Sequence, residues 1–165
     1  MNGLEELRCA MADYLNGQGV WAVPAWEAGQ RMKPDEAVAA VSLRGCEGGP
    51  AGFQDYLGQQ YDPESGLWRE LYGRRAQVTL GLDIRASRSG GERACTQMFS
   101  AMVQALTVGG PEGMRLQELS CGETVFDEAE GLFRLPVKAV GVVFLYAVTD
   151  ENGSFTDFTV KGTRR

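Results

Sequence analysis

The chain has no histidine among its 165 residues. Histidine is the side chain that most often works as a general base near neutral pH, and it activates most nucleophilic serines and cysteines. Its absence therefore excludes Ser–His and Cys–His catalysis and most catalytic zinc sites. The sequence favours a protein that is not an enzyme, and no catalytic residues are assigned.

Cysteine and glycine motifs are lacking as well. The four cysteines, at positions 9, 46, 95 and 121, are too far apart for a Cys-x-x-Cys metal site. Free thiols in a reducing cytosol are the simplest interpretation. The glycine-rich stretch Gly48-Gly-Pro-Ala-Gly52 lacks the Gly-Lys-Ser/Thr ending of a phosphate-binding loop. We therefore expect no metal and no cofactor.

Long apolar runs are also missing. The longest, Ala139–Val148, is about half the length of a membrane-spanning helix. The segment Met1–Gly19 is charged and lacks the apolar centre of a signal peptide. The net charge of −6 argues against binding nucleic acid through its phosphates. We expect a protein that is made and used in water, without a membrane partner.

Four carboxylates gather in residues 123–130, a stretch without any basic residue. Hydrolysis of a glycoside by two carboxylates needs them on opposite sides of a cleft, and closeness in the sequence does not indicate that arrangement. A solvated acidic surface is the simpler interpretation.

The composition itself is that of a globular protein, with 44% hydrophobic and 23% charged residues. These values and the chain length predict one domain, residues 1–165. Apolar residues at helical spacing predict an amphipathic helix over Met1–Gln18, and Asn16-Gly17 ends it. Short strands are expected at Val20–Ala25 and Glu36–Arg44.

The strongest local pattern is the alternation of apolar and polar residues over Ala76–Ala86, which predicts a strand with one buried face. A helix should follow from Glu92 to Thr107. The rest reads as strands, above all Leu132–Val148, followed by an Asn152-Gly153 hairpin turn and a last strand. The predicted fold class is α+β, a mixed or antiparallel sheet meander with two helices packed on it. Its expected core residues are Leu80, Leu82, Ile84, Met98, Met102, Val142 and Phe144.

Residues Glu47–Arg74 are predicted to form a long loop between two strands. Connections of this length are uncommon unless they carry a function. One interpretation is a lid whose rings fold back on the core. The other, which we favour, is a contact surface, because tyrosine and tryptophan are enriched at protein interfaces. The predicted assembly interface consists of Phe53, Tyr56, Tyr61, Trp68 and Tyr72.

Three short motifs, together with the order of the elements, resemble the tail-terminator (tail-completion) proteins of long-tailed phages and prophages. The motifs are Gly52-Phe-Gln-Asp-Tyr-Leu-Gly58, Trp68-Arg-Glu-Leu-Tyr-Gly-Arg-Arg75 and Leu119-Ser-Cys-Gly-Glu123. As an architecture, the resemblance covers most of the chain. It implies a virion structural protein without catalytic residues.

The resemblance further implies a homo-oligomer, a hexameric ring that caps the tail tube, stops its polymerisation and joins it to the neck. The expected partners are copies of the chain, the tail tube protein and a neck or connector protein. DNA would only pass through the lumen, where an acidic wall repels it. The protein would be in the host cytoplasm during assembly and then in the virion. Two alternatives remain: another neck, head–tail connector or baseplate subunit, and a small intracellular ligand-binding domain that uses the loop as a lid.

Overall fold

The computed structural model describes residues 3–27, 29–50, 55–149 and 155–161. It contains two helices and one mixed, nine-stranded sheet, so the predicted α+β class is confirmed. The helices are α1 (Gly3–Gly17) and α2 (Gly91–Val108). The strands are β1 (Ala22–Val23), β2 (Ala37–Pro50), β3 (Tyr56–Asp62), β4 (Leu67–Ala86), β5 (Arg115–Cys121), β6 (Val125–Asp127), β7 (Leu132–Leu135), β8 (Val137–Thr149) and β9 (Phe155–Lys161).

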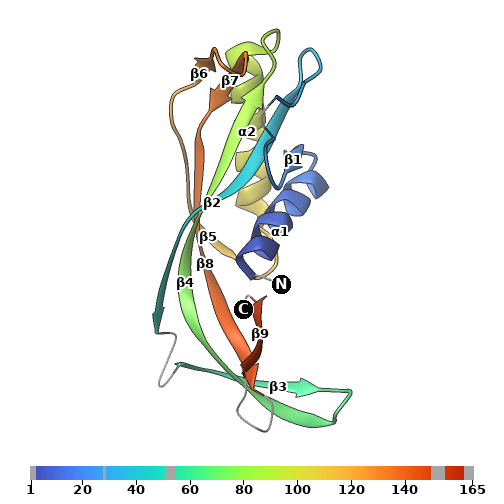
Figure 1. Cartoon of the computed structure of the whole chain (residues 1–165), viewed down its shortest axis with the longest axis vertical. Helices are drawn as coiled ribbons and strands as arrows, with labels where there is room; N and C mark the ends of the chain where they lie inside the picture. Colours follow the sequence, from blue (N-terminus) through green and yellow to red (C-terminus); the bar gives the residue numbers. More distant parts are fainter. Residues whose placement is uncertain (1–2, 28, 51–54, 150–154, 162–165) are drawn as a thin grey trace.

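Strand β4 is the spine of the sheet and runs along most of the molecule (Figure 1). β2 and then β3 pair with one side of it, and β8 and β7 pair with the other side. β8 in turn carries β5 and β9. These pairs are antiparallel, and β1 adds to β2 in parallel. β4 and β8 are therefore both internal strands of one sheet.

The two helices cover one face of the sheet, and the core lies between them and β4 (Figure 1). The even-numbered residues of β4 from Ala76 to Ala86 point to this face and are fully buried, as the period of two predicted. Helix α2 contributes Cys95 and Met102, and α1 contributes Met11 and Leu15. Among the predicted core residues, Leu80, Leu82, Ile84 and Met102 are confirmed in the core, and Met98 packs against it.

Two predicted core residues, Val142 and Phe144, belong to the other face of the sheet. They pair with Gln77 and Arg75, whose side chains point away from the helices. Val142 is buried and Phe144 is half-buried, but neither is part of the core cluster. β8 is apolar on both faces, so its residue pattern does not indicate which face the helices cover.

Three predicted boundaries are wrong. The expected strand Leu132–Val148 is two strands, β7 and β8, which meet at Pro136 because proline has no N–H for the ladder. β2 continues past Arg44 to Pro50, and most of the expected loop Glu47–Arg74 is strand. The expected turn at Asn152-Gly153 lies outside the described residues.

On the face away from the helices, Asp83 joins its own strand, β4, to three neighbours, β2, β7 and β8. Its carboxylate is only 5% exposed and accepts hydrogen bonds from Arg44 and from Arg134 Nη2 (2.6 Å), and also from the Val137 N–H. The Arg44 side chain crosses directly over Gly81, where a Cβ atom would overlap it. Glycine at this position therefore allows the ion pair to form.

Replacing Asp83 by alanine should destabilise the fold by about 2 kcal/mol. The change leaves two arginines and one backbone N–H without their acceptor, and the arginines recover part of the loss because their side chains reach water. Asp83→Asn keeps the size and one acceptor oxygen and should cost less. Urea unfolding measures both variants. Equal stability of Asp83→Ala and the unchanged protein would contradict the role given to this carboxylate.

Candidate assembly interface

The predicted aromatic loop is a β-hairpin that projects from the sheet, and we call residues Tyr56–Tyr72 the arm. It is formed by β3 and the first residues of β4, and in Figure 1 it lies at the end of the sheet that the helices do not cover. β8 accompanies β4 only as far as Leu71, which pairs with Val148. Among the described strands, residues 67–70 thus pair with β3 alone, so the tip of the arm is a two-stranded ribbon.

Asp62 holds the turn of the arm. Its side chain accepts hydrogen bonds from the Ser65 hydroxyl (2.8 Å) and the Glu64 N–H (3.0 Å), and its carbonyl accepts one from the Gly66 N–H (2.8 Å). The bonds to the carboxylate, first the one from the Ser65 hydroxyl and then the one from the Glu64 N–H, lower the pKa of Asp62 below its ordinary value. Gly66 has φ 69°, a conformation that favours glycine. The local sequence therefore specifies a tight reversal at this point.

Four of the five predicted interface residues lie together on one face of the arm. Tyr61 is the cross-strand partner of Trp68, with ring centroids 5.4 Å apart, and Tyr56 is the partner of Tyr72, with centroids 5.6 Å apart. Trp68 is 66% exposed, Tyr61 50% and Tyr56 41%. The fifth residue, Phe53, lies outside the described residues. The two ring pairs therefore lie on one face of the arm, with the Gln59–Glu70 pair between them, and we call this the aromatic face.

The aromatic face continues the face of β4 that is buried in the body of the protein. Trp68 and Tyr72 alternate in phase with Ala76 and Val78, both fully buried under the helices. β4 has no irregularity in its pairing with β8 that would change this phase. The rings are thus outside the core cluster, on a part of its sheet face that neither helix reaches.

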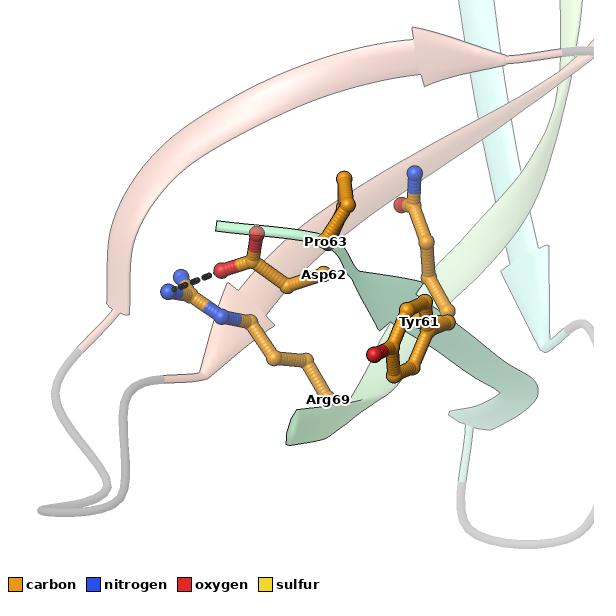
Figure 2. Close-up of a pocket in the computed structure, with 5 residues that line it drawn as sticks. Tyr61, Asp62, Pro63 and Arg69 are labelled. Atoms are coloured by element: carbon orange, nitrogen blue, oxygen red, sulfur yellow. Dashed lines mark ion pairs between the residues drawn. The ribbon is translucent and has the colours of Figure 1, made fainter. Parts of the chain in front are cut away.

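Several charged groups of the arm and its base have partners nearby. Arg69 Nη2 lies 2.6 Å from Asp62 Oδ2, as Figure 2 shows, and Arg74 Nε lies 3.6 Å from Asp55 Oδ2. The Tyr72 hydroxyl donates a hydrogen bond to Glu70 (2.6 Å), which raises the pKa of the tyrosine. These pairs reduce the number of charges that would lose their partners if the arm were covered by another protein.

A hollow of about 190 Å³ lies at the tip of the arm, lined by Gln60, Tyr61, Asp62, Pro63 and Arg69 (Figure 2). Sites for small molecules usually enclose about 300–1,000 Å³. Two of its lining residues, Asp62 and Arg69, already pair with each other. The arm therefore offers a protruding surface for contact, and the hollow lacks the volume of a typical ligand site.

Residue types associated with chemistry are dispersed in the part of the chain that the structure describes. No three His, Cys, Asp or Glu residues there are grouped to hold a metal ion. Cys95 is buried in the core, which raises its pKa to about 11, whereas Cys46 and Cys121 are exposed. Within the same residues, neither helix is long and apolar enough to cross a bilayer.

The sequence identified the ring residues of the arm but missed that they pair across two strands. A usable signal was present in Asp62-Pro-Glu-Ser-Gly66, a turn sequence flanked by aromatic residues on both sides. Comparison with known proteins adds no relative: no protein-family model matches the chain, and no curated protein matches it.

Proposed function

We propose that this protein is a non-enzymatic structural subunit that assembles with copies of itself through the arm. In the phage or prophage setting that its motifs resemble, the assembly is a ring that caps the tail tube, stops its polymerisation and joins it to the neck. The observation that carries this proposal is the aromatic face, four paired rings held away from the core of their own subunit.

The stability of the arm supports a docked role. A two-stranded hairpin is marginally stable in water unless a third strand or another layer packs on it. The tip of the arm has neither among the described residues, yet the arm as a whole exposes a tryptophan and two tyrosines, and such side chains bury about 150–250 Å² each when covered. A partner that covers the aromatic face would supply the missing layer and stabilise both itself and the arm.

The edge of the arm supports the same role. Exposed edge strands are commonly protected by lysine, proline or inward-pointing charges, which prevent unwanted pairing. β3 has the sequence Tyr-Leu-Gly-Gln-Gln-Tyr-Asp, with one charged residue, at its end. Its outward edge is therefore open to a protein partner along almost its whole length.

The proposal predicts that the purified protein self-associates as its concentration rises. Sedimentation velocity should show monomers at low concentration and one closed species of defined size at high concentration. Purified tail tubes of the matching phage, if added, should acquire this species at one end, visible by electron microscopy. A protein that stays monomeric at every attainable concentration, and leaves tube ends bare, would contradict the proposal.

A further inference from the structure

The outward face of α2 has the character of a protein interface. The chain has no charged residue between Arg93 and Glu112, a stretch that includes most of α2. Surface helices ordinarily carry charged residues on the face opposite the core. After the charged first turn with Glu92 and Arg93, the exposed positions of α2 instead form two adjacent uncharged rows at spacings of four, three and four. The rows are Thr96, Ser100, Val103, Thr107 and Gln97, Ala101, Gln104, Val108, and together we call them the outer α2 face.

The hydroxyl groups of this face already have partners. Thr96 donates to the Glu92 carbonyl (3.1 Å), Ser100 to the Thr96 carbonyl (3.0 Å) and Thr107 to the Val103 carbonyl (2.7 Å). A polar group that is satisfied within its own helix loses little when water is removed. The hydroxyls therefore turn inward, and the face presents mainly methyl groups and two glutamine side chains.

Apolar side chains on the same face are left in water. Val108 is 86% exposed and Val103 is 37% exposed. Interface cores are depleted in charged residues, so removing water from them costs little free energy. The outer α2 face has both properties, and neither α1 nor the sheet covers it in the subunit.

The arm and the outer α2 face match in length, and both carry few charged residues. From Trp68 to Tyr72 the aromatic face extends about 13 Å along β4, and from Thr96 to Thr107 the helix face extends about 16 Å. The helix face is uncharged. On the arm, Arg69 pairs with Asp62, and Glu70, the one charged residue between the ring pairs of the aromatic face, accepts a hydrogen bond from the Tyr72 hydroxyl. Docking would therefore cover a single carboxylate, and that carboxylate keeps its hydrogen bond.

The two surfaces of one chain do not meet. α2 packs beside the carboxyl-terminal half of β4 and beside β7, whereas the arm begins at the opposite end of β4 (Figure 1). Trp68 and Ile84 are separated by about 50 Å of extended strand. A contact between the arm and an outer α2 face therefore joins different copies of the chain.

We propose that the aromatic face of one copy docks on the outer α2 face of the next copy. This inference rests on the proposed self-assembly and names its contact. Because the two surfaces differ, the contact is heterologous, and each subunit uses its arm on one side and its helix on the other. Together, the half-exposed rings of the arm offer on the order of 400 Å² of accessible surface. This is about half of the area that one partner contributes to a standard interface. A single contact is therefore weak, and closure of a ring stabilises it.

Disulfide trapping between two variants tests the contact. One variant carries Gln59→Cys, and the other carries Ser100→Cys. Gln59 is the cross-strand partner of Glu70 and lies on the aromatic face between the two ring pairs. Both are made in a background without the native cysteines 9, 46 and 121. Mixing the two under mild oxidation should give a cross-linked heterodimer, and neither variant alone should cross-link. Gln30→Cys in place of Ser100→Cys serves as the control and should give no product.

Other occupants give other products. A homodimer of the Gln59→Cys variant would show that arms pair with arms, and a homodimer of the Ser100→Cys variant would show that helices pair with helices. Either result, or no product at all, would overturn the inference. Cross-linking of the control to the same extent would also overturn it, because trapping would then reflect random collision.

A charged variant separates this inference from the proposed function. Ser100→Glu combined with Val103→Glu adds two charges to the outer α2 face and should weaken self-association about a hundredfold. Gln30→Glu with Gln117→Glu adds the same charge elsewhere and should leave association unchanged. If the arm is needed for assembly while the charged α2 variant assembles normally, the inference fails and the proposed function stands. If the unchanged protein does not associate, both fail.

Discussion

Replacing Leu82 by aspartate is expected to leave no folded, soluble protein. Leu82 is fully buried on the face of β4 that the helices cover, and it pairs with Val41 of β2. Aspartate there would either bury an unpaired carboxylate or pull the strand out of register. Either change costs more free energy than the folding stability of a typical domain. Soluble yield and circular dichroism measure the outcome.

The matched control is Gln77→Asp, a similar change on the same strand. Gln77 is exposed on the opposite face, so the new carboxylate stays in water and the protein should fold. The two variants together test the alternation of β4. A stable, soluble Leu82→Asp variant would contradict the assignment of this strand face to the core.

Truncating two rings of the arm, Tyr56→Ala with Trp68→Ala, is expected to abolish assembly and leave the monomer folded. An aromatic hot spot contributes about 2 kcal/mol or more to association, so two truncations should weaken it about a thousandfold if they are roughly additive. Folding should be little affected, because both rings are exposed and lie outside the core cluster. Sedimentation gives the association constant, and thermal unfolding gives the stability.

The control for this variant truncates the other face of the arm, with Gln60→Ala and Leu67→Ala. Both positions alternate out of phase with Trp68, so they point away from the aromatic face. This control should assemble like the unchanged protein. Loss of folding in the Tyr56→Ala, Trp68→Ala variant would show that the rings support the fold, and normal assembly with normal folding would show that the arm makes no essential contact.

The parts of the fold that the sequence predicted correctly are those in which burial imposes a period. Apolar and polar residues alternate in β4 because one of its faces is buried from Ala76 to Ala86. Helices α1 and α2 each carry a stripe of apolar residues because one side of each helix packs on the sheet. The arm carries no such period. In Leu67–Tyr72 neither face is buried, so each face combines apolar residues with a charged one: Trp68, Glu70 and Tyr72 on one, and Leu67, Arg69 and Leu71 on the other.

β3 was harder still to predict. A register shift between Tyr56 and Gly58 interrupts its alternation, and Gly58 has φ 134°, which few other residues adopt. The strand is also held by only one described neighbour, so little in its composition reflects packing. The outer α2 face was missed for a related reason. This face is distinguished by its lack of charged residues. That lack indicates an interface only once the structure shows which side of the helix is exposed.

Hydrogen–deuterium exchange on dilute and concentrated protein tests most directly whether the arm is the assembly element. The account predicts that concentration into the associated state slows exchange in residues 56–72 and leaves Val78–Ile84, already protected in the core, unchanged. If the protein associates while exchange in the arm stays as fast as in the monomer, another surface makes the contact, and the central role of the arm is contradicted.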